Sequence, residues 1–347
     1  MKALCYHGPE DIRLDTIADP IIQDDRDVIV RTLACGICGS DLHIYHGHAG
    51  SGETGFCVGH EAVGEVVEVG RAVRALKTGD RVMMSASVGC GQCPSCLAGN
   101  IVRCTSGHRS APVYGGGHDL QGCQAEAVRV PAAESNVARL PEGVSVEQAL
   151  MLTDNLPTAW FGCRNADIRP GSTVAVVGLG PIGLMAVEAA FVLGASRVFA
   201  IDLVAQRREL AAGLGAVSFG PETAVEAIRD ATHGRMAESV VEAVGADATI
   251  QLALRLAGVQ GVVSVVGVNQ SQRMDFPLTA AFWRNLTFRI GLCPVQGLWP
   301  ELIPLVQQGR LRPERFITSR LPLAEGPQAY RIFAERRAGA LKTVLTP

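Results

Sequence analysis

One short stretch of the chain, residues 35–43, places the thiols of Cys35 and Cys38 beside the hydroxyl of Ser40 and the imidazole of His43. Two cysteines separated by two residues occur in redox pairs, in half of a zinc knuckle, or simply at the end of a strand. The stretch is therefore ambiguous by itself. The other reactive residues of the chain have to decide between these interpretations.

A second group of reactive residues has the spacing C-x2-C-x2-C-x7-C and consists of Cys90, Cys93, Cys96 and Cys104. Four thiolates at short spacing are typical of a closed, tetrahedral structural zinc site. The alternatives are four buried free cysteines, a redox cluster, or an iron–sulfur cluster, although the last gap differs from the common iron–sulfur spacings. Large apolar residues are few here, so we expect the metal to substitute for a core.

A glycine-rich turn with the pattern G-x-G-x-x-G follows a β-branched run at 173–177 and precedes a helical pattern at 184–194. Between a strand and a helix, such glycines let the backbone approach a pyrophosphate at the helix N-terminus. A glycine-rich turn without a nucleotide is the alternative. The predicted cofactor-binding residues of the turn are Gly178, Gly180, Pro181, Ile182 and Gly183.

An acidic residue, Asp202, ends the next predicted strand, which covers residues 197–201. Its carboxylate would accept hydrogen bonds from the adenosine ribose hydroxyls and would repel a 2′-phosphate, which favours NAD over NADP. Arg207 weakens that preference, because an arginine nearby can accept a phosphate.

Hydride transfer to NAD requires an alcohol whose proton can leave. A zinc ion with three protein ligands and one open position lowers the pKa of a bound water to about 7. Cys38 and His60 are ligands of suitable softness, and Asp154, just ahead of a proline-started helix, is the candidate third ligand. A core histidine and a helix N-cap are the plain alternatives for His60 and Asp154. We expect Cys35 to be packed in the strand.

The elements around these residues suggest two domains in the 347-residue chain. Residues 1–154 read as short strands joined by turns and would form the zinc-binding domain. Residues 155–292 alternate between β and α patterns, which predicts an α/β, doubly wound parallel sheet that binds the dinucleotide. Residues 293–347 lose this regularity, and we expect them to return to the first domain.

Bulk properties exclude other classes of function. The net charge of −3 gives no footprint for nucleic acid. No apolar run reaches the roughly 18–20 residues of a membrane span, and the first residues lack a signal-peptide pattern. The odd count of eleven cysteines argues against a closed disulfide framework. We therefore expect a cytoplasmic protein without nucleic-acid or membrane partners.

Taken together, the segments 36–43, 59–61 and 178–183 and the four-cysteine group resemble the zinc-containing medium-chain alcohol dehydrogenase family over essentially the whole chain. The resemblance implies a Rossmann cofactor domain and a mainly β, GroES-like catalytic domain with a structural-zinc lobe. It also implies a catalytic zinc held by Cys38, His60 and a third residue. Many members use cysteine in that third place. The presence of Asp154 there is similar to a bacterial branch that includes formaldehyde dehydrogenases and some secondary alcohol dehydrogenases.

The resemblance implies further roles in catalysis. Ser40 would accept the alcohol proton and pass it through the nicotinamide ribose to His43. Glu61 is similar to the family's glutamate that can approach zinc during ligand exchange. One departure is Gly39, where some members carry a residue that binds phosphate.

Contacts to the cofactor follow from the same resemblance. Thr158 would lie by the nicotinamide, Arg207 would touch the adenosine ribose, and Lys342 would reach the pyrophosphate.

We therefore predict a homo-oligomeric (dimeric or tetrameric) alcohol dehydrogenase that uses NAD and two zinc ions per chain and interconverts a small alcohol with its aldehyde or ketone. The alternatives within this class are a formaldehyde dehydrogenase or dismutase and a polyol dehydrogenase. A non-catalytic NAD-binding protein is the alternative from another class.

Overall fold

The computed structural model describes residues 1–48, 52–105, 113–335 and 339–347. They form two compact units: unit 1 is Met1–Pro157 with Pro294–Pro347, and unit 2 is Thr158–Cys293. The breaks lie up to three residues later than the positions 154 and 292 predicted from the sequence, since helix α5 (Asn155–Asn165) spans the first of them. Among the described helices, none has the length and apolar character of a membrane span.

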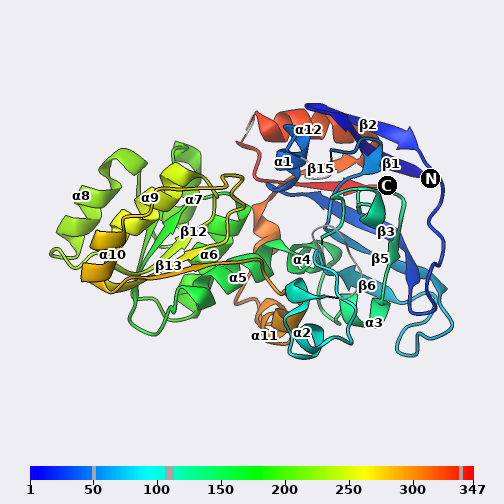
Figure 1. Cartoon of the computed structure of the whole chain (residues 1–347), viewed down its shortest axis with the longest axis horizontal. Helices are drawn as coiled ribbons and strands as arrows, with labels where there is room; N and C mark the ends of the chain where they lie inside the picture. Colours follow the sequence, from blue (N-terminus) through cyan, green and yellow to red (C-terminus); the bar gives the residue numbers. More distant parts are fainter. Residues whose placement is uncertain (49–51, 106–112, 336–338) are drawn as a thin grey trace. The chain divides into compact units, whose positions relative to one another are not determined.

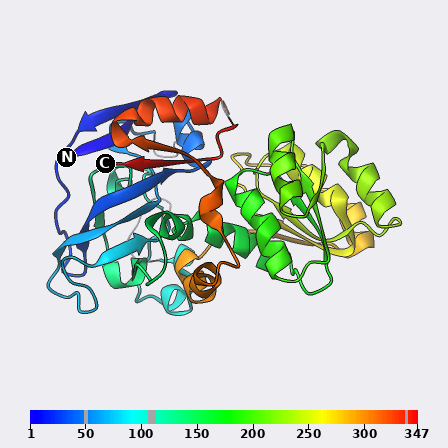
Figure 2. The ribbon, with the colours of Figure 1, turned by 180° about the vertical axis from the view of Figure 1, so that it is seen from behind.

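Unit 2 is a doubly wound sheet of six parallel strands in the order β11-β10-β9-β12-β13-β14, as the alternating pattern predicts. Helices α6 and α9 pack against the central strand β9, and α7 and α8 pack beside them. Helices therefore cover the sheet (Figures 1 and 2). The elements of unit 2 that follow α5 are β9 (Thr173–Val177), α6 (Pro181–Val192), β10 (Arg197–Ile201), α7 (Ala205–Gly213), β11 (Val217–Phe219), α8 (Pro221–Ala231), β12 (Ala237–Glu242), α9 (Asp247–Leu256), β13 (Ala257–Val265), α10 (Leu278–Arg284) and β14 (Thr287–Ile290).

The strand order reverses at β9, which has β10 on one side and β12 on the other. In open α/β sheets, ligands bind beyond the carboxyl end of the strands at such a reversal. The glycine-rich turn lies there, directly between β9 and α6. A Cβ on Gly183 would stand 1.7 Å from the carbonyl oxygen of Gly178, so this close helix–strand packing requires glycine.

Unit 1 is mainly β, with two sheets. One contains strands in the order β15-β16-β3-β5-β6-β8, with β7 also paired to β3, and the other has the order β2-β1-β4. Its elements are β1 (Lys2–Gly8), β2 (Asp11–Thr16), β3 (Val28–Ile37), α1 (Asp41–Tyr45), β4 (Phe56–Cys57), β5 (Ala62–Val69), β6 (Arg81–Met84), α2 (Pro94–Leu97), β7 (Ala127–Val130), α3 (Ala133–Asn136), β8 (Val137–Arg139), α4 (Val146–Leu152), α11 (Val295–Gln307), β15 (Ile317–Pro322), α12 (Gly326–Ala334) and β16 (Lys342–Thr346).

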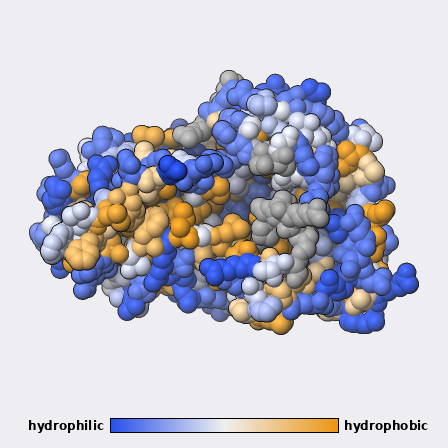
Figure 3. Space-filling view, in the orientation of Figure 1, coloured by the Kyte–Doolittle hydropathy of each residue, from blue (hydrophilic) through white to orange (hydrophobic). Residues whose placement is uncertain are grey.

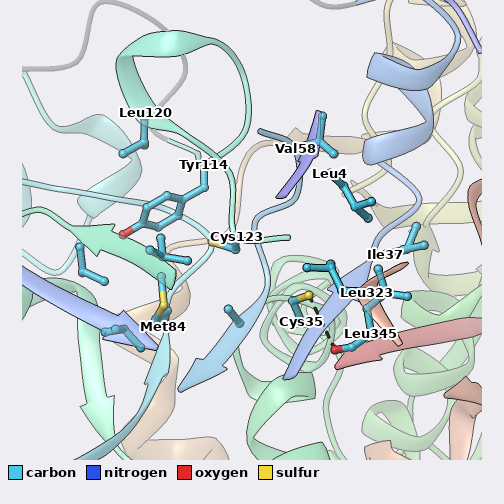
Figure 4. Packing of buried hydrophobic residues seen from close by; sticks show 14 of the residues in the cluster. Leu4, Cys35, Ile37, Val58, Met84, Tyr114, Leu120, Cys123, Leu323 and Leu345 are labelled. Carbon is cyan, nitrogen blue, oxygen red and sulfur yellow. Dashed lines mark hydrogen bonds between the residues drawn. The ribbon is translucent and has the colours of Figure 1, made fainter. Parts of the chain in front are cut away.

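The C-terminal segment Pro294–Pro347 belongs to unit 1, where β16 pairs antiparallel with β3. The core around this pairing is apolar and closely packed (Figure 4). Cys35 belongs to it: its side chain is fully buried, and its Sγ donates to the carbonyl oxygen of Leu345 at 3.7 Å. Cys35 is thus a packed strand residue, in agreement with the prediction.

Candidate metal and cofactor sites

The first candidate site gathers Cys38, His60, Glu61 and Asp154, whose ligand atoms all lie within 4.8 Å of one another. Pairing between β3 and β5 makes this possible, since Cys38 directly follows β3 and His60 and Glu61 directly precede β5. Asp154 comes from the link between α4 and α5. All three predicted ligands of the catalytic metal therefore lie in one cluster within unit 1.

The distances in this cluster suit a tetrahedral zinc. Asp154 Oδ2 lies 3.5 Å from Cys38 Sγ and 3.6 Å from His60 Nε2. Bonds of usual length to a tetrahedral zinc would separate a sulfur and an oxygen ligand by about 3.5 Å. One thiol, one imidazole and one carboxylate are also donors that zinc accepts. The residues present therefore fit the ion that the sequence predicts.

A contact with the Asp41 carboxylate, which is itself held by buried hydrogen bonds, orients the imidazole of His60. Its Nδ1 lies 3.2 Å from Asp41 Oδ1, which leaves Nε2 facing Asp154. Asp41 Oδ2 accepts from the Cys38 backbone N–H at 2.9 Å and from Gln124 Nε2 at 3.2 Å, and Tyr330 donates its hydroxyl to Gln124 at 2.9 Å. A carboxylate behind a metal-binding histidine fixes its tautomer and ring orientation.

The pKa values of the two softer ligands reflect this crowded interior. Burial, and then the nearby Asp154 carboxylate, raise the pKa of the Cys38 thiol. Burial alone would lower the pKa of His60, but Asp41 and Asp154 together raise it well above its usual value. Both shifts favour the protonated forms of the two groups.

The fourth member of the cluster, Glu61, is fully buried, and both of its oxygens accept hydrogen bonds. Asn155 Nδ2 donates to Oε1 at 2.7 Å, and Lys342 Nζ donates to Oε2. Lys342 is also fully buried, and its ammonium donates to the carbonyl oxygen of Ile37 at 3.1 Å. Its predicted contact with a pyrophosphate stays a prediction.

Of the two residues of the predicted proton relay, Ser40 lies next to the same cluster. Ser40 Oγ is 3.3 Å from His60 Nε2. His43 lies in α1 and is half-buried; burial, and then the charges of His48 and His46, lower the pKa of its imidazole. Ser40 is thus close to the candidate ligands, and the transfer from Ser40 to His43 stays a prediction.

The four-cysteine group forms a second candidate metal site. One sulfur from each of the four residues lies within 4.8 Å of the others, and the Sγ atoms of Cys90 and Cys96 are 4.0 Å apart. Backbone N–H groups of Gln92 and Cys93 point at Cys90 Sγ. Similar backbone hydrogen bonds lower the pKa of Cys93 to about 6, whereas burial raises the pKa of Cys96, so Cys93 forms the metal-binding thiolate more readily. This site fits zinc and offers no open position.

The nucleotide-binding residues predicted in unit 2 lie at the carboxyl end of β9 and β10. Gly178 has φ of +89°, and a Cβ there would meet Val244 at 2.3 Å, so the turn needs glycine at this position. Gly180 caps α6 and faces open space. Asp202 accepts from the backbone N–H of Leu179 at 2.7 Å, which fixes its carboxylate against the turn. The N-terminus of α6 and this carboxylate suit a dinucleotide.

The remaining predicted cofactor residues, Thr158 and Arg207, also belong to unit 2. Thr158 is buried in α5, and Arg207 is half-buried in α7. The neighbouring Arg208 donates to the carbonyl oxygens of Asp202 and Leu203, so it supports the backbone around the acidic residue. The contacts of Thr158 and Arg207 with a nucleotide stay predictions.

Sequence reasoning missed several residues that support the first site. Asn155, Gln124 and Tyr330 contact its ligands or their partners, and none of them forms part of a recognisable motif. Gly36 and Asp41 lie within the 36–43 segment, but the sequence does not indicate their contacts with Glu61 and His60. The one available signal for Asn155 was its position beside Asp154.

Two family models match the chain. The model described as the alcohol dehydrogenase GroES-like domain matches residues 24–142, and the model described as zinc-binding dehydrogenase matches residues 181–308. These matches agree with the mainly β unit 1 and the parallel sheet of unit 2, which confirms the predicted fold class.

Relatives and solved structures cover the whole chain. A probable zinc-binding alcohol dehydrogenase of Mycobacterium tuberculosis is 44% identical over 347 residues, which is 100% of this chain and 89% of the relative. The structure of an alcohol dehydrogenase from Thermus sp. ATN1 matches with a TM-score of 0.92 and 40% identity over 100% of this chain and 99% of that one. An NADP-bound structure of a putative zinc-binding dehydrogenase from Sinorhizobium meliloti matches with a TM-score of 0.84 and 29% identity, covering 100% and 99% of the two chains.

The raised pKa values of Cys38 and His60 predict proton release when metal enters the first site. With the four-cysteine site already loaded, zinc uptake at pH 7 should release about two protons per chain, because a metal ligand must be deprotonated. Zinc affinity should therefore fall as the pH is lowered, since protons compete more strongly for both groups. Calorimetric titrations in two buffers of different ionisation enthalpy measure the release. Release of only about one proton would show that the pKa of His60 is not raised, because a thiol of ordinary pKa, about 8.5, is protonated at pH 7 in either case.

Proposed function

The chain belongs to the zinc-containing medium-chain alcohol dehydrogenase family, and we propose that it transfers hydride between a small alcohol and NAD. As a member of this family it is a zinc-dependent alcohol oxidoreductase. The observation that carries the proposal is the three-ligand cluster of Cys38, His60 and Asp154, in which two distances match a tetrahedral zinc. The glycine-rich turn with Asp202 supports the nicotinamide cofactor.

Each residue near the cluster would have a defined task in alcohol oxidation. Cys38, His60 and Asp154 would hold the ion, which when bound acts as a Lewis acid toward the reacting oxygen. A bound nicotinamide would accept the hydride of the alcohol carbon, and the hydroxyl proton would then have to reach solvent. Ser40 Oγ, which lies beside His60, would take that proton, and His43 would deliver it to solvent. The lowered pKa of His43 suits this task, because a neutral imidazole can accept the proton.

A matched pair of variants tests the function and separates the two metal sites. Asp154→Asn should remove one of two zinc ions and lower alcohol oxidation by at least about a hundredfold, since even indirect metal partners cost up to that much. Its melting temperature should stay close to that of the wild type. Cys96→Ser should instead lower the melting temperature by at least about 5 °C, because this metal replaces a core.

Zinc quantification, calorimetry and a panel of primary, secondary, aromatic and polyol substrates provide the readouts. Unchanged zinc content and activity in Asp154→Asn would reject this residue as a ligand. Turnover of an aldehyde by the purified wild type without added NAD would favour the dismutase alternative. A wild type with zinc only in the four-cysteine site and no activity would favour a non-catalytic NAD-binding protein.

We propose NAD rather than NADP as the cofactor. The Asp202 carboxylate is held against the turn by Leu179 and Val204, whose N–H groups donate to its two oxygens. A negative charge fixed in this place would repel a 2′-phosphate. Because the Sinorhizobium meliloti relative binds NADP, the preference of this chain for NAD over NADP has to be measured.

Replacing the acidic residue tests this preference. Asp202→Ala should raise the KM for NAD by about tenfold, the cost of losing one charged hydrogen bond to the ribose. It should also reduce the discrimination against NADP. The NAD and NADP values of kcat/KM for the wild type and the variant are compared, and an unaltered ratio would count against the ribose contact.

We also propose that the chain assembles as a homo-oligomer through unit 2. Strand β14 is the edge of the six-stranded sheet, and its Ile290 is 60% exposed. The neighbouring α10 buries none of its residues and exposes about three quarters of Phe282 and Trp283. Hydrophobic residues gather on this face over α10 and β13 (Figure 3). A second copy could pair its own β14 with this edge by two-fold symmetry and cover the patch.

The oligomer is expected to weaken when the apolar face is made charged. The double variant Phe282→Glu/Ile290→Lys should shift the mass measured by light scattering from that of a dimer or tetramer toward that of a monomer. A monomeric wild type would contradict the proposal.

Both metal sites need reduced thiols. This requirement fits our expectation that the protein works in a reducing compartment such as the cytoplasm.

A further inference from the structure

The first metal cluster contains one more possible ligand than an open site can use. Ligand atoms of Cys38, His60, Glu61 and Asp154 all lie within 4.8 Å of one another, so all four could close around one ion. A zinc with four protein ligands has no position for a substrate. Something in the chain must therefore keep one of the four residues away from the metal.

Glu61 is the member whose oxygens are both engaged by groups other than the cluster's ligands. Asn155 Nδ2 donates to Oε1 at 2.7 Å, and the Lys342 ammonium donates to Oε2. Glu61 and Lys342 are fully buried, and Asn155 is 2% exposed. A buried carboxylate that lost either partner would be left under-satisfied, so it would turn to the metal ion, which is the nearest other cation.

The amide of Asn155 also contacts the ligands themselves. The same Nδ2 lies 3.2 Å from Asp154 Oδ2 and 3.8 Å from Cys38 Sγ. One amide nitrogen therefore bridges the outer carboxylate and the ligand carboxylate and sets the spacing between them. A leucine of similar size would remove both donors, while an aspartate would add a third negative charge.

The absence of a side chain on Gly36 leaves room for the other oxygen of the same carboxylate, Oε2. A Cβ on this residue would stand 2.1 Å from Glu61 Oε2 and 3.0 Å from Lys342 Nζ. The φ angle of Gly36 is not in the positive range, so space rather than backbone conformation requires the glycine. The carboxylate and the ammonium occupy the volume that a side chain at this position of β3 would fill.

We propose that Asn155 is a positioning residue that, together with Lys342 and the space beside Gly36, holds Glu61 outside the coordination sphere and so keeps the fourth position of the metal open. The inference rests on the proposed function, because it assumes a metal held by Cys38, His60 and Asp154. It assigns Asn155 a role that neither the ligand motif nor the glycine-rich turn indicates.

The test uses the purified full chain with Co²⁺ in place of the catalytic zinc and imidazole as a probe that adds to an open position. Wild-type protein should show a saturable shift of the visible Co²⁺ absorption bands on titration with imidazole. In Asn155→Leu, Glu61 should occupy that position, and the apparent Kd for imidazole should rise by at least about tenfold, as expected for an altered outer partner. The control is Asn165→Leu, at the other end of the same helix, which should behave like the wild type.

Removing the glutamate should reverse the effect. The double variant Asn155→Leu/Glu61→Gln should regain imidazole binding, because the amide of glutamine is a much poorer ligand than a carboxylate. Gly36→Ala displaces Oε2 directly and should weaken imidazole binding in the same way, so it serves where Asn155→Leu does not fold.

The outcomes separate this proposal from the proposed function. An Asn155→Leu protein that retains one Co²⁺ and binds imidazole like the wild type would overturn the role of Asn155. A double variant that stays closed to imidazole would also overturn it, since Glu61 would not be the group that closes the site. A wild type that takes up no Co²⁺ outside the four-cysteine site would contradict the proposed function itself.

Discussion

The structure of unit 1 depends on one buried ion pair, between Glu61 and Lys342. These two residues are 281 positions apart in the sequence, and both are fully buried. Burial would by itself lower the pKa of Lys342, but Glu61 raises it, so the ammonium stays charged. Breaking such a pair costs several kcal/mol, typically about 3–5, because it leaves a buried charge uncompensated. The C-terminal strand β16, which carries Lys342, is therefore held against β3 by more than its backbone hydrogen bonds.

The surrounding elements bring the metal ligands close to this ion pair. Strands β3 and β5 bring Cys38, His60 and Glu61 together, and the link before α5 adds Asp154 and Asn155. Both oxygens of Glu61 and the Lys342 ammonium have hydrogen-bond partners, as an interior of low dielectric demands. The result is a site whose ligands are positioned before a metal arrives, so that little reorganisation is needed on binding.

Much of this arrangement could be predicted from the sequence, because metal ligands and phosphate-binding glycines follow fixed local spacings. The four cysteines from Cys90 to Cys104 and the turn at 178–183 are of this kind, and so is the β-branched run that forms β9. The partners of Glu61 could not be predicted, since they depend on contacts between distant segments. Lys342 is an example, because its contact with Glu61 follows only from the pairing of β16 with β3.

The most direct test of the account is the anomalous diffraction of crystals of the zinc-loaded protein, measured at the zinc absorption edge. The account predicts two peaks per chain. One should lie among Cys90, Cys93, Cys96 and Cys104, and the other should be bonded to Cys38, His60 and Asp154, with both oxygens of Glu61 outside bonding distance. A single peak in the four-cysteine site, or a second peak bonded to Glu61, would contradict it.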